Sequence, residues 1–118
     1  MKENVLLEQS RAFAKEIEKL CKSLYCNRGM DNYIHQLRKS SSSIFANISE
    51  AQYPQSVADM LSKFRIALKE CIETESWLDM LHDSEYISDE EFKRNRNSCG
   101  RLRRLLIASC STLEKNSN

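Results

Sequence analysis

The clearest chemical signal in the sequence is a run of basic side chains near the C-terminus. No acidic residue occurs between Phe92 and Leu113. At helical spacing the basic side chains fall within about half of the circumference, opposite an apolar stripe that includes Cys99 and Leu102. They are Lys93, Arg94, Arg96, Arg101, Arg103 and Arg104. A cationic face of this kind suits the phosphate backbone of RNA or DNA.

A second basic group near the N-terminus would extend this face, because the first and last helices of an up-down bundle are neighbours. It consists of Arg11, Lys15, Lys19 and Lys22. No aromatic residue is interleaved with the basic residues of the last helix, so stacking on single-stranded bases is not indicated. The formal net charge is only +1. A protein-interaction scaffold without a nucleic-acid role is therefore the alternative.

One acidic residue lies where an apolar residue is expected. In the third helical segment Glu75 falls on the apolar stripe, about 60° around the helix from Met60. An isolated ionised carboxylate in a core is costly, so Glu75 should be paired, protonated or at the edge of the stripe. Arg38, which flanks the apolar face of the second helix, is the natural partner. We interpret Arg38 and Glu75 as structural buried polar residues, and we predict that Glu75 pairs with Arg38, or with another polar group, inside the protomer.

No set of residues forms a catalytic or metal-binding motif. A di-metal site in a bundle needs Glu-x-x-His on two helices, and only Asp79 with His82 approaches that spacing. Nucleophile-elbow, phosphate-loop and H-E-x-x-H patterns do not occur. The sequence therefore predicts no enzyme activity, cofactor, metal or small-molecule substrate.

The elements that must position these residues are four helices. Apolar residues recur at helical spacing through nearly the whole chain, and two glycines and one proline among 118 residues argue against an all-β fold. The pattern predicts an antiparallel up-down four-helix bundle, formed as a single domain from residues 1–118. The expected landmarks are a turn at Asn27–Asp31, a second helix over 32–52, N-caps at Ser56 and Ser88, and a frayed tail at 114–118.

The third segment also has a second apolar group, nearly opposite its core stripe. Ile66, Trp77 and Met80 cannot all face the core, which indicates contact with another subunit, although coverage by neighbouring loops is an alternative. On the outer side of the second helix a strip of small residues, Ser40–Ser43, favours close approach of another helix. The predicted oligomer interface consists of Ser43, Asn47, Glu50, Ile66, Trp77 and Met80.

Cysteine usage and hydropathy predict the compartment. The five cysteines are odd in number and form no C-x-x-C pair, as is typical of a reducing cytoplasm. No stretch approaches the ~18 apolar residues of a membrane span. We expect a soluble, cytoplasmic protein with no membrane partner.

Two segments resemble a known family. They are S-I-x-x-N-I-x-E-A at Ser43–Ala51 and I-A-L-K-E-x-x-E-T-x-x-W-L at Ile66–Leu78, and a weaker similarity occurs at Tyr86–Ser88. They resemble the small four-helix-bundle proteins encoded in intervening sequences of bacterial 23S ribosomal RNA genes, over Phe13 to Leu113. The chain departs from that family at Phe45, where proline or glycine is frequent.

The resemblance implies a homo-oligomer, typically a homopentamer, and no enzymatic activity. The chain is also similar to the accessory proteins of diversity-generating retroelements, which are more basic and bind nucleic acid.

Overall fold

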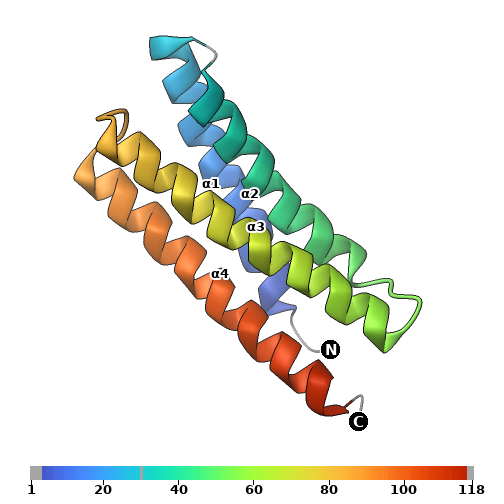
Figure 1. Cartoon of the computed structure of the whole chain (residues 1–118). Coiled ribbons are helices and arrows are strands. Elements are labelled where there is room, and N and C mark those ends of the chain that lie inside the picture. Colours follow the sequence, from blue (N-terminus) through green and yellow to red (C-terminus); the bar gives the residue numbers. More distant parts are fainter. Residues whose placement is uncertain (1–3, 30, 117–118) are drawn as a thin grey trace.

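The computed structural model describes residues 4–29 and 31–116. Within these ranges it contains four helices and no strand. The helices are α1 (Val5–Arg28), α2 (Asn32–Glu50), α3 (Val57–Asp83) and α4 (Asp89–Asn116). Each helix runs antiparallel to the one before it (Figure 1). The prediction of an all-α, up-down four-helix bundle is confirmed.

Short polar sequences determine where the last two helices begin. At the start of α4 the Ser88 hydroxyl accepts from the Glu91 N–H at 3.1 Å, and the Glu91 carboxylate accepts from the Ser88 N–H at 2.9 Å. This is the predicted capping box. At the start of α3 the Ser56 hydroxyl accepts from the Asp59 N–H at 3.0 Å, but the shorter Asp59 side chain accepts from Gln55 at 3.1 Å instead. Both predicted caps are confirmed.

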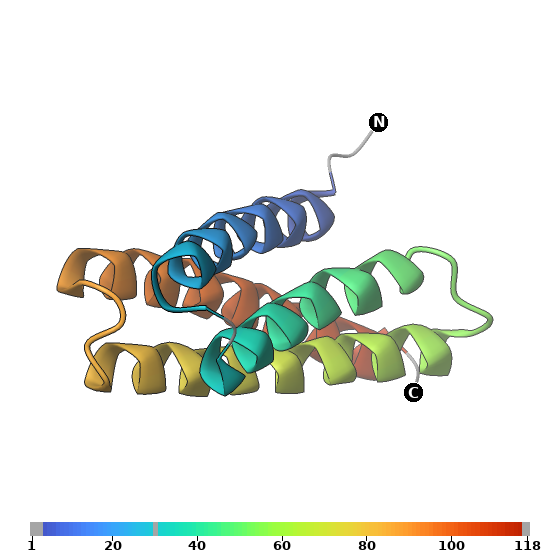
Figure 2. The same ribbon diagram turned by 90° about the horizontal axis from the view of Figure 1, so that it is seen from above.

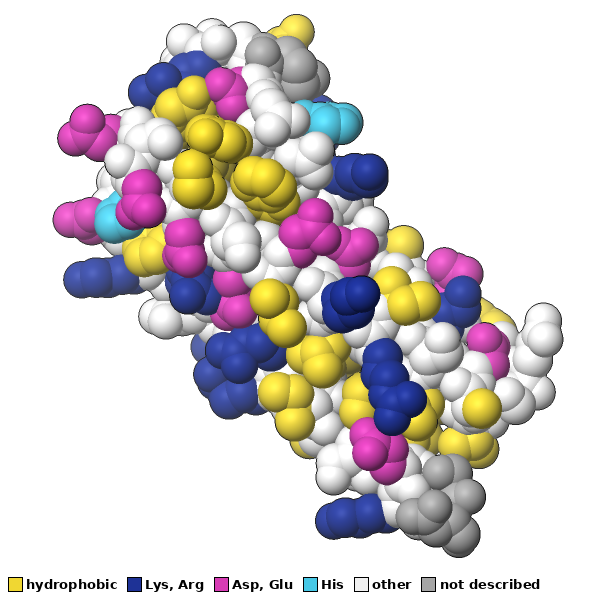
Figure 3. Space-filling model, viewed as in Figure 1, with side chains coloured by type: hydrophobic (Ala, Val, Ile, Leu, Met, Phe, Trp, Pro, Cys, Tyr) yellow, Lys and Arg dark blue, Asp and Glu magenta, His cyan; other side chains and the backbone are white. Residues whose placement is uncertain are grey.

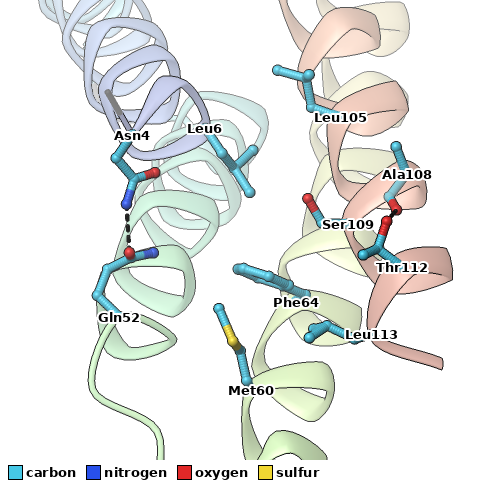
Figure 4. Close-up of a pocket in the computed structure, with 10 residues that line it drawn as sticks. All are labelled: Asn4, Leu6, Gln52, Met60, Phe64, Leu105, Ala108, Ser109, Thr112 and Leu113. Carbon is cyan, nitrogen blue, oxygen red and sulfur yellow. Dashed lines mark hydrogen bonds between the residues drawn. The ribbon is translucent and has the colours of Figure 1, made fainter. Parts of the chain in front are cut away.

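The helices are packed unequally. α3 lies between α2 and α4, while α1 rests mainly on α2 and shares the fewest contacts with α4. Figure 2 shows α1 diverging from α4 toward its N-terminal end. The opening is a pocket of about 420 Å³ that Leu6, Phe64 and Leu113 line from three helices. Its rim includes a hydrogen bond between Asn4 and Gln52 (Figure 4).

The core is made of the apolar stripes that the periodicity indicated. Ile17, Leu37, Leu78 and Leu106 are each fully buried, one from every helix. All five cysteines are free, and four of them are buried. None of the helices in the described ranges combines the length and apolar character needed to cross a membrane.

The serine strip of α2 forms part of the contact with α3. Ser40 and Ser41 are buried, and the Thr74 hydroxyl of α3 donates to the Ser40 hydroxyl at 2.8 Å. Ser40 in turn donates to the Leu37 carbonyl at 3.2 Å. The expected close approach of another helix is thus made by α3 of the same chain.

Two boundaries differ from the sequence expectation or fall partly outside the described ranges. α4 continues to Asn116, so residues 114–116 are helical and the prediction of a frayed tail is wrong for them. A pair between Arg65 and Glu114 at 3.5 Å joins this last turn to α3. Residues 117–118, and Met30 within the predicted first turn, lie outside the described residues. Gly29, which ends α1, has a φ of 77°, a conformation that favours glycine.

Candidate functional site

Glu75 lies between two arginines of α4, and not beside Arg38. Its carboxylate is 2.6 Å from Nη1 of Arg96 and 3.2 Å from Nε of Arg103, and its side chain is only 12% exposed. The prediction that Arg38 is the partner of Glu75 is therefore wrong, whereas the alternative, a pair with another polar group of the same chain, is what the structure contains. Arg38 instead forms a two-pronged pair with Glu18 of α1, with Nε to Oε1 at 2.8 Å, and its side chain is about half exposed. The hydrogen bond with Glu18 raises the pKa of Arg38.

Glu75 faces α4 and not α2 because successive residues of α3 point in different directions. Thr74 faces α2, where it bonds Ser40, and the next residue is rotated by about 100°. That rotation points Glu75 toward α4. Arg96 and Arg103 are seven residues apart, nearly two turns, so both lie on the side of α4 that faces Glu75. This spacing is the signal that could have identified the true partners.

Asp79 completes the ion-pair network in the groove between α3 and α4. It lies one turn after Glu75, and its carboxylate is 3.2 Å from Nε of Arg96. Arg96 thus bridges two carboxylates of α3, and Arg103 contacts one. The arginine side chains are about one-third exposed, so the network lies at the edge of the core and not in solvent.

Gly100 lies in the interior of α4, at the centre of this network. A glycine inside a helix costs about 1 kcal/mol relative to alanine, and Gly100 does not have the positive φ that would explain it. A Cβ at this position would lie 3.4 Å from Nη1 of Arg104, 3.8 Å from Nη2 of Arg103 and 4.0 Å from Oε2 of Glu75. These are ordinary van der Waals distances, so a methyl group would fit, whereas a larger side chain would occupy the space beside the guanidinium groups.

A polar hollow of about 500 Å³ surrounds Gly100. Its lining contains no apolar side chain and consists of Glu75, Arg96, Asn97, Gly100, Arg101, Arg103 and Arg104. We call it the arginine hollow. Basic side chains gather over the middle of α4 in the space-filling view (Figure 3). Within the described ranges no ion pair engages Arg101 or Arg104, so their guanidinium groups are available to an external anion.

The basic residues of α1 belong to a different surface. Arg11, Lys15, Lys19 and Lys22 line a hollow whose one residue from another helix is Phe45 of α2. The guanidinium carbon of Arg11 lies 5.2 Å from the centroid of that ring. Between α1 and α4, the residues that face one another include Glu16 and Arg101. The structure therefore does not join the two basic groups into the continuous face that the sequence suggested.

The predicted interface residues lie along α2 and α3, several of them already in contact with their own chain. Ile66 and Met80 are exposed on α3. Trp77 is partly covered by Tyr33 of α2, with ring centroids 6.0 Å apart, so the covering element is a helix and not a loop. Among the described residues its buried indole N–H has no hydrogen-bond partner.

The α2 members of that set also have intramolecular partners. Asn47 donates to the Ser43 carbonyl at 2.8 Å, and Glu50 pairs with Lys63 of α3 at 3.3 Å. Sequence reasoning missed two exposed isoleucines, Ile72 of α3 and Ile107 of α4.

The two histidines do not take part in a metal cluster. His82 pairs with Asp89 at 2.6 Å and stacks on Phe92 at the α3–α4 turn, and the bond from His82 lowers the pKa of Asp89. In the part of the chain that the structure describes, no three His, Cys, Asp or Glu side chains are grouped so that they could hold a metal ion.

Fold and site together define a small all-α bundle whose last two helices enclose a carboxylate-anchored arginine cluster. The chain belongs to the 23S rRNA-intervening sequence protein family, whose sequence model matches residues 2–108. The resemblance inferred from the two sequence motifs is thus confirmed.

Solved structures are similar to this chain, and the following one matches over most of its length. It is described as a protein with unknown function from the S23 ribosomal protein family of Bacteroides thetaiotaomicron VPI-5482. It is 38% identical, with a TM-score of 0.87, and the match covers 89% of this chain and 97% of that one. Comparison with curated proteins gave no match.

Proposed function

We propose that this chain is a non-enzymatic, self-assembling bundle subunit that binds structured RNA or DNA through the basic face of α4. The observation that carries the proposal is that Arg101 and Arg104 form no ion pair with any residue that the structure describes. They lie beside two further arginines, Arg96 and Arg103, that Glu75 holds in place. Arginine is suited to phosphate because its planar guanidinium presents donors in a fork that matches two phosphate oxygens.

Binding of this kind is electrostatic and weakly dependent on sequence. Each phosphate that the protein neutralises releases condensed counterions, so the logarithm of the affinity falls with the logarithm of salt concentration by about 0.9 per phosphate on B-form DNA. No aromatic side chain lines the arginine hollow, so base stacking does not contribute there. The basic group of α1 would act as a separate, weaker patch.

Self-assembly is supported by the apolar side chains on the outer face of α3. Ile66, Ile72 and Met80 are exposed by 40%, 53% and 37%, and three such residues on one helix favour burial against another subunit. A homo-oligomer, a pentamer by family resemblance, would present the α4 face several times to one duplex. Repetition raises avidity without any new contact.

A filter-binding titration with duplex RNA at increasing salt tests the nucleic-acid part. We expect retention at low salt and a steep loss as salt rises. No retention of RNA or DNA at low salt would contradict the proposal, and the scaffold alternative would replace it.

Light scattering tests the assembly part separately. We expect a mass several times that of the 13.7 kDa chain at micromolar concentration. Met80→Asp, which adds a charge to the exposed face of α3, should lower that mass while the helical circular dichroism is unchanged. A monomeric wild type would contradict self-assembly without bearing on RNA binding.

A further inference from the structure

The arginine hollow has the features of a fixed anion site. Two guanidinium nitrogens, Nη2 of Arg103 and Nη1 of Arg104, and a carboxylate oxygen of Glu75 all come within 4.0 Å of the point where a Gly100 side chain would begin. Glu75 compensates part of this positive charge. An anion bound in the hollow would be attracted by the rest.

The arginines differ in how firmly they are held. Arg96 is fixed by Glu75 at Nη1 and by Asp79 at Nε, and Arg103 is fixed by Glu75 at Nε. Fixing Arg103 through Nε orients the plane of its guanidinium and leaves its terminal N–H groups for another acceptor. Arg101 and Arg104 add two positive charges from the same hollow with no carboxylate engaged.

The charge balance selects the ligand class. Four arginines face two carboxylates around the hollow, Glu75 and Asp79, so the site carries an excess of positive charge. The guanidinium groups of Arg103 and Arg104 both reach the space beside Gly100, and a phosphate offers more acceptor oxygens to two such groups than a carboxylate does. Glu16 of α1 lies near Arg101 on its other side, which leaves Arg103 and Arg104 as the closer donors to the hollow. Arginine forks bind phosphate oxygens in pairs.

We propose that the arginine hollow binds a single phosphate group, with Arg103 and Arg104 as its contacts and Glu75 as a positioning residue. The phosphate is either free, as inorganic phosphate or pyrophosphate, or part of a nucleic-acid backbone. The second case rests on the function proposed above. The first does not, because a free phosphate needs only the hollow.

Whether one substitution raises or lowers the phosphate affinity distinguishes a positioned site from a diffuse cationic surface. Glu75→Gln removes a negative charge, which would strengthen phosphate binding if only net charge mattered. In a positioned site it weakens binding about tenfold, because Arg96 and Arg103 lose the carboxylate that aligns them. Glu73→Gln removes the same charge from the exposed outer side of α3 and is the matched control, expected to have little effect.

The probe is a titration of pyrophosphate at constant ionic strength, followed through the arginine Nε–Hε resonances of the full chain. We expect saturable shifts of Arg103 and Arg104 in the wild type and in Glu73→Gln. Tighter binding by Glu75→Gln, or shifts without saturation in the wild type, would overturn the proposal.

A second variant keeps the test valid if Glu75→Gln unfolds. Gly100→Leu fills the hollow and leaves every charge in place, and leucine is a good helix former. It should stay helical and lose most pyrophosphate affinity. Gly100→Ala is its control, since the nearest atom to a methyl group is the flexible end of Arg104 at 3.4 Å, and this variant should preserve most binding. Unchanged binding by Gly100→Leu would refute the site.

Duplex RNA in the same variants distinguishes this inference from the proposed function. Pyrophosphate binding that is lost in Gly100→Leu, with no RNA retention by the wild type, would establish the phosphate site and refute nucleic-acid binding. RNA retention that is equal in the wild type and Gly100→Leu, with no pyrophosphate binding, would support nucleic-acid binding and refute the phosphate site.

Discussion

The groove between α3 and α4 and the groove between α1 and α2 both place arginine against glutamate. They differ in how firmly these side chains are held. In the first, Glu75 is nearly buried and is held by two arginines, with Asp79 adding a further contact. In the second, the described residues give Arg38 one ion-pair partner, Glu18, whose side chain is 34% exposed against 12% for Glu75. Ion pairs gain little in water and become critical where one partner is desolvated. The two grooves therefore carry similar residues but only one has fixed geometry.

The largest expected effect is on stability. Glu75→Ala leaves Arg96 and Arg103 facing each other without their shared carboxylate, and we expect a loss of about 3 kcal/mol in the free energy of unfolding. Glu18→Ala, the matched change in the other groove, should cost about 0.5 kcal/mol. Urea denaturation of both variants measures the difference. Equal losses would remove the distinction between the grooves.

The next effect is on nucleic-acid binding. Reversing charge at Arg101 and Arg104 together should lower duplex RNA affinity at least about tenfold at low salt, because several phosphate contacts are lost. The same reversal at Lys15 and Lys22 on α1 should have a smaller effect, since their long side chains are exposed and unconstrained. Neither double variant touches Glu75, so both should unfold near the wild-type midpoint. A larger effect from α1 would contradict the assignment of binding to α4.

The sequence predicted the helices because their signals are local. The capping box at Ser88 depends on residues three apart, and the apolar stripes depend on spacing within one helix. It also singled out Glu75 as anomalous. Its partners were not found, because helical spacing shows on which side of its own helix a residue lies, but not which neighbouring helix is on that side. Arg96 and Arg103 were accordingly placed on a solvated face.

Gly100 is a feature of the sequence that marks the position of the arginine hollow. It interrupts a helix that is otherwise free of glycine, and in the structure the guanidinium groups of Arg103 and Arg104 lie beside it. The separation of the two basic groups could not be foreseen, since it depends on how α1 diverges from α4. Adjacent helices in an up-down bundle need not be in contact along their whole length.

Cysteines in the two grooves allow their opening to be compared. Burial, with a smaller contribution from Glu18, raises the pKa of Cys21 in the α1–α2 groove to about 12. A hydrogen bond with Cys71, together with burial, raises the pKa of Cys99 in the α3–α4 groove. Neither thiol should react in the closed protein, because the thiolate is the reactive form.

Reaction therefore reports local opening. Under native conditions at pH 8, we expect the exposed Cys26 to react with a thiol reagent first, Cys21 next and Cys99 last, as α1 has the fewest contacts with its neighbours. Mass spectrometry of timed samples gives the order. Modification of Cys99 as early as Cys21 would show that the ion-pair network does not hold its groove more tightly.

The smallest expected effect concerns the contact between Arg11 and Phe45. The guanidinium lies 5.2 Å from the ring centroid at an exposed site, where a cation–π contact is worth about 0.5–1 kcal/mol. Phe45→Leu keeps apolar bulk and removes the ring, and Arg11→Gln keeps the polar chain and removes the charge. A double-mutant cycle measured by urea denaturation should give a coupling free energy of about 0.5 kcal/mol. A coupling above about 2 kcal/mol would be that of a desolvated pair. It would mean that the α1–α2 groove is organised as firmly as the α3–α4 groove, and that its basic residues are equally strong candidates for binding phosphate.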